Sequence, residues 1–322
     1  MSILIYAESA EGKFKKAAFE LASYGKKVAE SLGTTVTAVA VNAGDVSELA
    51  KYGVDKVLKV NDEKLAKFTA KAYADVIAQA AQKENAKVIL LSSTTDSLYL
   101  APLAAVALQA GYASGVVGLP LGTSPFQVKR NAFSNKAFNI TEINTEIKIL
   151  GLAKNSYGVY ESPSSLAQED FSPSIGDADF GVKVESVEKV TGKVTIADAE
   201  VVVSGGRGLK GPENWGLIEG LAGVLGAATA CSKPVSDLGW RPHSEHVGQT
   251  GKPVATNLYI AVGISGAIQH IAGINSSKVK VVINSDPDAP FFKVADYGVV
   301  GDVFEVLPKL TEKLKEFKAN NS

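Results

Sequence analysis

Short β-branched runs alternate with longer amphipathic segments along this chain, and the alternation occurs twice. In the first part, alanine and leucine recur at helical spacing between strand-like runs, with lysines on the opposite face. Such alternation predicts a mostly parallel sheet with helices on both faces. The predicted strands are Ile3–Ala7, Thr35–Val41, Lys56–Val60 and Lys87–Leu91; the predicted helices are Phe14–Leu32, Glu63–Glu84 and Leu98–Ala110, the last capped by Thr94-Thr-Asp-Ser97.

The pattern changes after this first α/β stretch. Apolar and polar residues alternate in three further runs, which predicts antiparallel strands added to the sheet at Phe126–Arg130, Lys136–Asn139 and Glu146–Leu150. Tyr157–Gly181 is rich in Ser, Pro, Gly and Asp, so we expect an irregular surface segment there. Val182–Val190 is predicted as a last strand, and Thr191-Gly-Lys193 as the domain boundary.

The strand–helix alternation then restarts and predicts a second domain. We therefore expect an α/β protein of two doubly wound domains with mostly parallel sheets, residues 1–191 and 192–322. The predicted strands of the second domain are Glu200–Val203, Leu258–Ala261, Val279–Ile283 and Gly298–Val300; its predicted helices are Glu213–Leu225, one starting at Ala267–Ala272, and a terminal helix to about Lys318 whose start is left open by Pro308.

The composition excludes several classes of protein. Hydrophobic residues make up 46% and charged residues 21% of the chain, and the net charge of −1 gives no field that would draw it onto nucleic acid or an acidic membrane. One cysteine, Cys231, allows no intrachain disulfide and fits a reducing compartment. No leader peptide and no apolar run of roughly 20 residues is recognised, so we expect a cytoplasmic protein without membrane insertion.

Polar and glycine residues cluster where the predicted strands of the second domain end. In doubly wound sheets, ligands bind outside the carboxyl ends of the strands. The residues at these exits are Gly205–Gly208, Ser232, Gly263–Ser265, Asn284 and Asp302. Their shared placement predicts one composite site.

Gly206-Arg-Gly-Leu-Lys-Gly211 fits the Gly-x-Gly-x-x-Gly pattern of dinucleotide-binding loops. An NAD site also needs an acidic residue about twenty positions further on. Leu225–Cys231 contains no carboxylate, so a glycine turn serving only backbone geometry is the alternative. Arg207, in this loop, suits an anionic phosphate or an adenine face.

Two further polar elements have competing interpretations. Ser232 and Lys233 are a helix cap and a solvated charge in one interpretation, and ligand contacts in the other. Cys231 is most simply a small buried residue. His243-Ser-Glu-His246 lies in a loop without a third ligand, so we predict no metal site there.

Gln249-Thr-Gly251 and Gly263-Ile-Ser-Gly266 combine short hydroxyl side chains with glycines that let backbone amides face a ligand. Ser265 is predicted to start the helix that continues to His270, with its positive end toward a phosphate or an electron-rich ring. Asn284 either reads an adenine or ribose edge or makes a turn. Asp302 either caps the last helix, with Glu305 completing a capping box, or binds a ribose hydroxyl.

Taken together, these segments resemble one protein family. The run Leu258-Tyr-Ile-Ala-Val-Gly-Ile-Ser-Gly-Ala-Ile-Gln-His270, with Val201–Lys210 and Ala295–Asp302, is similar to the second domain of the electron transfer flavoprotein alpha subunit; the Ile-Tyr-Ala-Glu8 start extends the similarity to the first domain. The resemblance implies a heterodimer with a beta subunit. It also implies FAD in the alpha subunit's second domain, AMP in the beta subunit, and a first domain that contributes to the subunit interface.

The resemblance further implies an electron carrier of fatty acid β-oxidation and no catalytic residues. Single electrons pass from acyl-CoA dehydrogenases and other flavin dehydrogenases to a membrane quinone oxidoreductase. Gln249 and Thr250 are expected near the flavin N5/O4 edge, and His270 near the N1/O2 edge, where a donor or cation favours the negatively charged, one-electron-reduced flavin. The FAD contacts implied are Arg207, Ser232, Lys233, Val247, Gly248, Gln249, Thr250, Ser265, Gly266, Ala267, Ile268, Gln269, His270, Asn284 and Asp302.

Lys233 departs from the family pattern, which usually has arginine over the flavin. Lysine lacks the planar guanidinium that stacks on a ring, so we expect a lower potential for one-electron reduction. Three alternatives remain open: a variant that couples to NADH oxidation and splits electrons through a second flavin in the beta subunit, an NAD-dependent dehydrogenase based on Gly206–Gly211, and a nucleotide-binding sensor without redox function.

Overall fold

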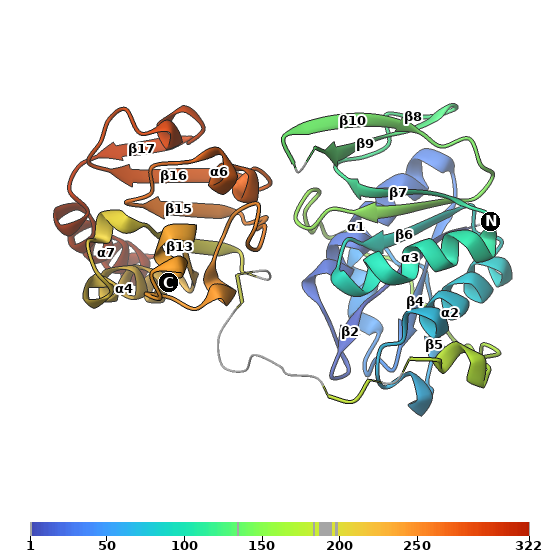
Figure 1. The fold of residues 1–322 in the computed structure, drawn as a ribbon. Coiled ribbons are helices and arrows are strands. Elements are labelled where there is room, and N and C mark those ends of the chain that lie inside the picture. Colours follow the sequence, from blue (N-terminus) through green and yellow to red (C-terminus); the bar gives the residue numbers. More distant parts are fainter. Residues whose placement is uncertain (1, 134, 183, 187–194, 197–198, 322) are drawn as a thin grey trace. The chain divides into compact units, whose positions relative to one another are not determined.

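The computed structural model describes the chain except residues 1, 134, 183, 187–194, 197–198 and 322 (Figure 1). It divides into two compact units: Met1–Phe133 with Ala137–Val187, and Ser134–Lys136 with Glu188–Ser322. The boundary predicted at 191–193 lies outside the described residues. Most of the strand predicted at 182–190 does so too, and its described residues, Val182 and 184–186, form no strand.

The first unit is built around a ten-stranded sheet in the order β10-β9-β7-β11-β6-β1-β4-β5-β12, with β8 paired to β9. Its helices are α1 (Lys16–Leu32), α2 (Ala70–Lys83) and α3 (Thr95–Leu108); its strands are β1 (Ser2–Tyr6), β4 (Thr35–Val41), β5 (Lys56–Val60), β6 (Val88–Ser92), β7 (Gly111–Val116), β8 (Gly122–Thr123), β9 (Phe126–Ala132), β10 (Ala137–Glu142), β11 (Lys148–Leu152) and β12 (Ala167–Asp170), with a small hairpin of β2 (Ser9–Ala10) and β3 (Lys13–Phe14).

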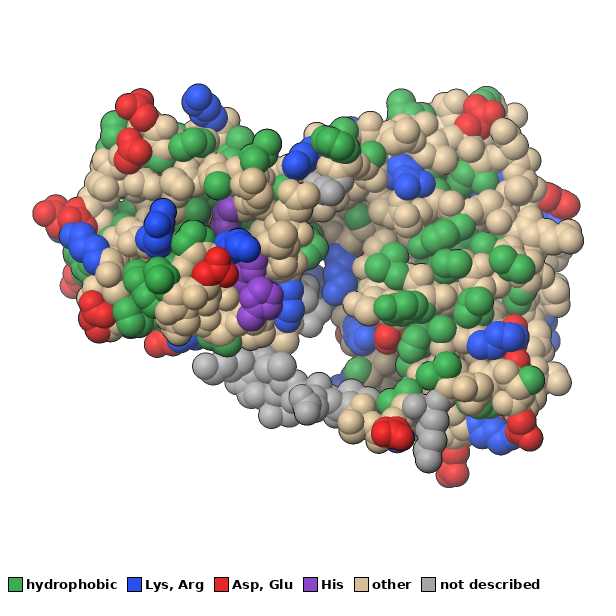
Figure 2. Space-filling view, viewed as in Figure 1, with side chains coloured by type: hydrophobic (Ala, Val, Ile, Leu, Met, Phe, Trp, Pro, Cys, Tyr) green, Lys and Arg blue, Asp and Glu red, His purple; other side chains and the backbone are tan. Residues whose placement is uncertain are grey.

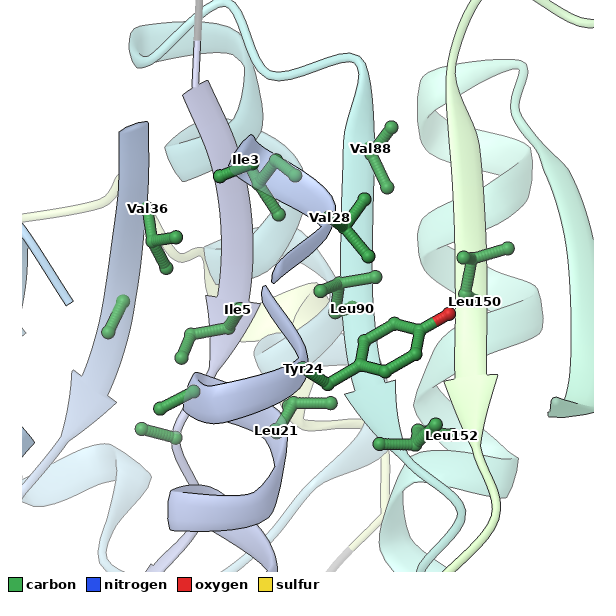
Figure 3. Close-up of a cluster of buried hydrophobic side chains, with 14 of the residues drawn as sticks. Ile3, Ile5, Leu21, Tyr24, Val28, Val36, Val88, Leu90, Leu150 and Leu152 are labelled. Carbon is green, nitrogen blue, oxygen red and sulfur yellow. The ribbon is translucent and has the colours of Figure 1, made fainter. Parts of the chain in front are cut away.

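Two apolar layers cover the two faces of this sheet. On one face, α1 packs Leu21, Tyr24 and Val28 against strand residues that include Ile5 and Leu90 (Figure 3). On the other face, α2 and α3 cover a second buried cluster. Parallel strands that are buried on both faces are expected to be nearly all apolar, as β1 and β6 are.

The third predicted antiparallel strand is wrong in direction. β9 and β10 do form an antiparallel pair, but β11 runs parallel to both β6 and β7. The physical reason is burial. Ile149, Leu150 and Leu152 are all buried because β11 is an interior strand covered on both faces, so the alternation before them does not mark a half-exposed strand.

Local geometry also corrects one predicted helix and one predicted loop. The helix expected from Glu63 to Glu84 is split into a short 3₁₀ turn, Glu63–Leu65, and α2. The Tyr73 hydroxyl donates to the Leu65 carbonyl at 2.7 Å, so this carbonyl is held by a side chain at the break. The segment expected to be irregular, 157–181, is largely so but contributes the edge strand β12, which pairs with β5.

The second unit holds a five-stranded parallel sheet in the order β14-β13-β15-β16-β17. Ile218 and Leu221 of α4 and Leu307 of α7 cover one face, while Ile274 of α6 and Phe291 belong to the cluster on the other. Its strands are β13 (Val201–Gly205), β14 (Ala228–Cys231), β15 (Leu258–Val262), β16 (Val279–Asn284) and β17 (Tyr297–Val300); its helices are α4 (Gly216–Leu225), α5 (Lys233–Asp237), α6 (Ile268–Ile274) and α7 (Val303–Asn320).

The terminal helix begins at Val303, and Pro308 lies inside it. Across the part of the chain that the structure describes, no helix has both the length and the apolar character needed to cross a membrane.

Candidate nucleotide site at the carboxyl edge of the second sheet

The chain order of the second sheet reverses between β13 and β15. From β13 the chain moves to β14 on one side and then returns to β15 on the other. At such a switch point the two loops leave the sheet in opposite directions, and the crevice between them is where doubly wound domains bind ligands. The loops at this point are Gly205–Leu209 and Gly263–Gly266.

Glycines bring these two loops into backbone contact. The Gly208 amide donates to the Gly263 carbonyl at 3.1 Å, and a Cβ on Gly208 would lie 2.7 Å from the Gly263 Cα. A Cβ on Gly206 would collide with the Gly263 carbonyl oxygen. Gly263 itself has φ of +62°, a conformation that favours glycine.

This packing accounts for the Gly206–Gly211 pattern without a dinucleotide. Arg207–Leu209 forms a 3₁₀ turn, and the next α-helix, α4, begins only at Gly216. In an NAD-binding loop the glycines open the helix directly, so its N-terminus faces the pyrophosphate. The structure therefore favours the geometric interpretation of these glycines over the NAD interpretation.

The exit of β14 joins the same edge. The Ser232 amide donates to the Gly205 carbonyl at 3.1 Å, and the Val247 amide donates to the Cys231 carbonyl at 3.0 Å. Ser232 occupies the N-cap of α5, although its side chain makes no capping hydrogen bond. Lys233 follows it, exposed, with its Nζ 3.9 Å from the Asp237 carboxylate.

The loop after Val247 lies against α6. The Gln249 amide donates to the Gln269 carbonyl at 2.8 Å, and a Cβ on Gly273 would lie 2.6 Å from the Gly248 Cα. Gln249 and Thr250 remain exposed. Their side chains are therefore free to face a ligand while the backbone beneath them is fixed.

Of the two starts predicted for α6, Ser265 is wrong, whereas the start at Ala267–Ala272 is confirmed to within one residue. Gly266 has φ of +90°, which a right-handed helix does not accommodate, and the helix begins at Ile268 with Ala267 at its N-cap. The Ser265 carbonyl instead accepts the Phe291 amide at 3.0 Å. The segment approaching α6 is thus an extended turn held against the Phe291 backbone.

For Asn284 and Asp302 the sequence left both a structural role and a ligand-binding role open. In the structure, both residues make the structural contacts. The side-chain Nδ2 of Asn284 donates to the Ile264 carbonyl at 3.1 Å, which ties the end of β16 to the loop after β15. Its Oδ1 accepts a hydrogen bond from the Asp286 backbone N–H at 3.0 Å. Asp302 caps α7 by accepting the Phe304 amide at 2.9 Å. A capping box with Glu305 is not formed, since Asp302 alone supplies this cap.

His270 is a buried polar residue in the first turn of α6. Its Nε2 lies 2.9 Å from the Tyr259 hydroxyl, and its Nδ1 has no hydrogen-bond partner among the described residues. Burial, together with the neighbouring His246, lowers the pKa of His270 to about 4. The imidazole is therefore neutral at physiological pH.

In the sequence, His246 stands out only as part of the possible metal-binding motif His243-Ser-Glu-His246. No group of three or more His, Cys, Asp or Glu residues able to hold a metal ion occurs in the described part of the chain. His246 is instead buried, with an unpartnered Nδ1, and burial followed by the charge of His243 lowers its pKa. A Cβ on Gly251 would lie 2.8 Å from that Nδ1, so Gly251 closes the loop over the ring.

Sequence reasoning missed two further groups in this unit. Tyr259 lies within the buried β15 run, where its hydroxyl gives no periodic signal. Arg241 forms a two-point ion pair with Glu245, at 2.9 Å and 2.7 Å, and its guanidinium carbon lies 5.3 Å from the centre of the Trp215 ring.

Burial raises the pKa of Cys231 to about 12, consistent with an inert, buried thiol.

The predicted site residues therefore lie along one edge of one sheet, in two layers. Figure 2 shows histidine, basic and acidic side chains together on the surface of the C-terminal unit. Exposed at the edge are Arg207, Lys233, Gln249, Thr250, Ser265, Ala267, Ile268, Gln269 and Asp302; beneath them are the buried Ser232, Val247, Gly248, Gly266 and His270, with Asn284 half-buried.

This arrangement defines a nucleotide-binding α/β domain. A switch point with glycine loops, two exposed cations and an unpartnered buried imidazole nitrogen fits a ligand with phosphates and a polar ring edge. Residues 195–275 match the electron transfer flavoprotein FAD-binding domain, and residues 3–172 match the electron transfer flavoprotein domain.

Known proteins align with this chain over nearly its whole length. The chain is 34% identical to the electron transfer flavoprotein subunit alpha of Bacillus subtilis, covering 99% of each chain, and 37% identical to that of Syntrophomonas wolfei, covering 97% of this chain and 98% of the relative. It is 31% identical to the acryloyl-CoA reductase electron transfer subunit beta of Anaerotignum propionicum, covering 98% and 96%. The chain belongs to the electron transfer flavoprotein alpha subunit family, and its cofactor is FAD.

Proposed function

We propose that this chain is the FAD-carrying subunit of a heterodimer and passes single electrons between partner flavoproteins. The observation that carries this proposal is the group of loops at the β13/β15 switch point, together with the buried His270, whose Nδ1 has no hydrogen-bond partner among the described residues. Bound FAD supplies the one-electron redox chemistry. The chain's own residues bind it, orient it and exclude water from one side of it.

Each part of the edge has a distinct proposed contact. Arg207 and Lys233 offer exposed cations, suited to phosphate and to the ring. Gln249 and Thr250 lie on a fixed backbone and are proposed to face the N5/O4 edge. His270 is proposed to face the N1/O2 edge. Ser265–Gln269, Val247, Gly248, Ser232, Asn284 and Asp302 complete the proposed contacts.

The partner subunit is proposed to cover an apolar surface of the first unit. Alpha subunits of this family pair with a beta subunit, and the exposed face of α3 carries Tyr99, Leu98 and Val106, with 67%, 51% and 80% of their surfaces exposed. Figure 2 shows hydrophobic side chains gathered over this face. A contiguous apolar surface of this kind is typical of an interaction site.

The proposed pathway is that of a cytoplasmic carrier rather than a substrate-converting enzyme. Electrons enter from acyl-CoA dehydrogenases and other flavin dehydrogenases, and they leave to the respiratory chain through a membrane quinone oxidoreductase. The relative from Anaerotignum propionicum favours a second candidate, because it is the electron transfer subunit beta of acryloyl-CoA reductase. In that candidate the heterodimer couples to NADH and holds a second flavin in the beta subunit.

The absorption spectrum of the co-purified heterodimer tests the proposal. Flavin bands at about 375 and about 450 nm support it, and a colourless heterodimer that stays colourless after incubation with FAD contradicts it. Reduction by an acyl-CoA dehydrogenase and its substrate then supports the carrier. Reduction by NADH alone, with two flavins per heterodimer, supports the second candidate instead.

A further inference from the structure

The hydrogen bond between Tyr259 and His270 determines which ring nitrogen of His270 carries the proton. Both side chains are buried, with His270 6% and Tyr259 0% exposed, and the hydroxyl lies 2.9 Å from Nε2. A neutral imidazole has one N–H donor and one bare acceptor nitrogen. The role of Tyr259 in this bond therefore decides what the other nitrogen, Nδ1, offers to a ligand.

Tyr259 is the donor in this bond. Its hydroxyl has a single proton, and burial raises the pKa of Tyr259 well above its ordinary range, with the nearby Ser204 opposing this only in part. Nε2 lies 2.9 Å from this hydroxyl, and the other polar group beside it, the buried Ser204 hydroxyl, lowers the Tyr259 pKa as a donor toward the tyrosine oxygen does. If Tyr259 donated to Ser204 instead, the Ser204 O–H would be buried without an acceptor among the described residues.

With Nε2 accepting, the proton of the neutral ring lies on Nδ1. The Val247 backbone acts in the same sense, because it opposes the lowering of the His270 pKa, as an acceptor near a ring N–H does. It makes no hydrogen bond to Nδ1, which remains unpartnered among the described residues. A buried N–H without an acceptor is stabilised when a ligand brings an acceptor within hydrogen-bond distance.

We infer that Tyr259 is a positioning residue that holds His270 in the Nδ1-protonated form, so that a neutral N–H donor faces the electron-rich edge of the bound isoalloxazine. This inference rests on the proposed function. It adds that the histidine acts as a fixed neutral donor rather than as a cation. Tyr259 acts through His270 and does not touch the cofactor.

Nitrogen NMR of the heterodimer with labelled histidine, with and without FAD, tests this directly. The chain has three histidines, so the difference between the wild-type and His270→Gln spectra isolates the His270 signals even with a histidine-containing partner. We expect Nδ1 protonated and Nε2 bare in the wild type. A protonated Nε2 in the wild-type protein overturns the inference, whether or not any variant folds.

Tyr259→Phe removes the hydroxyl and keeps the ring. We expect the His270 signals to shift toward a mixture of the two tautomers, and the potential for one-electron reduction of bound FAD to fall. Tyr297→Phe is the matched control, because Tyr297 lies on β17 with 67% of its surface exposed and should change neither readout. A single unchanged tautomer in Tyr259→Phe would assign the control of His270 to Val247 and reject the role of Tyr259.

The two levels of failure are distinguishable. If wild-type heterodimer binds no FAD, the proposed function fails. If it binds FAD but shows the other tautomer, the proposed function stands and the positioning role of Tyr259 is rejected.

Discussion

A Cβ on Gly206 would lie only 2.1 Å from the carbonyl oxygen of Gly263, so the absence of a side chain at Gly206 allows the β13 and β15 loops to approach this closely. The contact lies at the switch point of the second sheet, where the β13 loop also donates hydrogen bonds to the end of β15: the Gly206 amide donates to the Val262 carbonyl at 2.8 Å. The separation of these two loops is therefore set by backbone-to-backbone packing.

Gly206→Ala should separate the two loops and weaken FAD binding. The blocking atom is backbone, so the chain must shift, and overpacking of this kind costs about 1–3 kcal/mol. Urea unfolding and FAD titration of the heterodimer measure both effects. Gly220→Ala is the control: nothing lies within 4 Å of its added Cβ, and alanine is the better helix former in α4. Equal affinity for FAD in both variants would contradict the prediction.

Arg241→Lys should destabilise the second unit although the charge is retained. Lysine cannot reproduce the two-point contact with Glu245 or the planar stacking on Trp215, and hydrogen bonds between charged groups contribute about 1.5–3 kcal/mol. Urea unfolding should show a clear loss. Lys313→Ala breaks an exposed pair with Glu316 and serves as the control, where we expect little change. A similar loss in both variants would show that the Arg241 geometry is unimportant.

The sequence pattern predicted two interior strands of the first sheet to the residue. β4 and β5 begin and end at the predicted residues, Thr35–Val41 and Lys56–Val60. The short strand β14 was missed because Ala228–Cys231 continues an apolar run that starts in α4, and no change of period separates them. The direction of β11 was missed because it depends on which strands lie beside it, which the local sequence does not encode.

The composite site could be predicted because strand exits of a parallel sheet share one edge. From the sequence alone, that rule predicts that Arg207, Ser232, Ser265 and Asn284 lie at the same edge of the second sheet. The pairing of Tyr259 with His270 could not be predicted in this way. It links a strand interior to a helix across the core, and each residue alone is typical of a structural position. The left-handed Gly266 likewise moved the start of α6, because a glycine's φ is set by tertiary contacts such as that with Phe291.

Val106→Glu should weaken pairing with the beta subunit. Val106 is 80% exposed on α3, so the substitution adds a charge without disturbing the core of the first unit. Co-purification of the two subunits measures the effect. Glu48→Lys, on an exposed 3₁₀ turn that precedes β5, is the control for a changed surface charge. Undiminished recovery of the beta subunit with Val106→Glu would place the interface elsewhere.

Acid should destabilise the protein through His270. Its pKa is about 4 in the folded chain against an ordinary 6.5, so the unfolded chain binds the extra proton between these values. The contribution is fully present above pH 6.5 and is lost as the pH falls toward about 4, by at most about 1.4 kcal/mol per pH unit.

His270→Gln removes this proton uptake. Urea unfolding at about pH 7 and about pH 5 should show a smaller loss of stability in the variant than in the wild type. His246 also has a lowered pKa, so a residual acid sensitivity is expected to remain. If the variant loses as much stability as the wild type over this interval, His270 is not the group that titrates.

Lys233→Arg should raise the potential at which bound FAD accepts its first electron. Lys233 lies at the start of α5, 57% exposed, next to the β13 exit through the Ser232–Gly205 hydrogen bond. A guanidinium spreads its charge over a plane that stacks on a ring, whereas an ammonium remains a hydrated point charge. Spectroelectrochemical titration of the heterodimer measures the shift. Lys309→Arg, an exposed lysine of α7, controls for the added side-chain bulk. An unchanged or lower potential in Lys233→Arg would contradict the prediction that a planar cation at residue 233 stacks on the flavin.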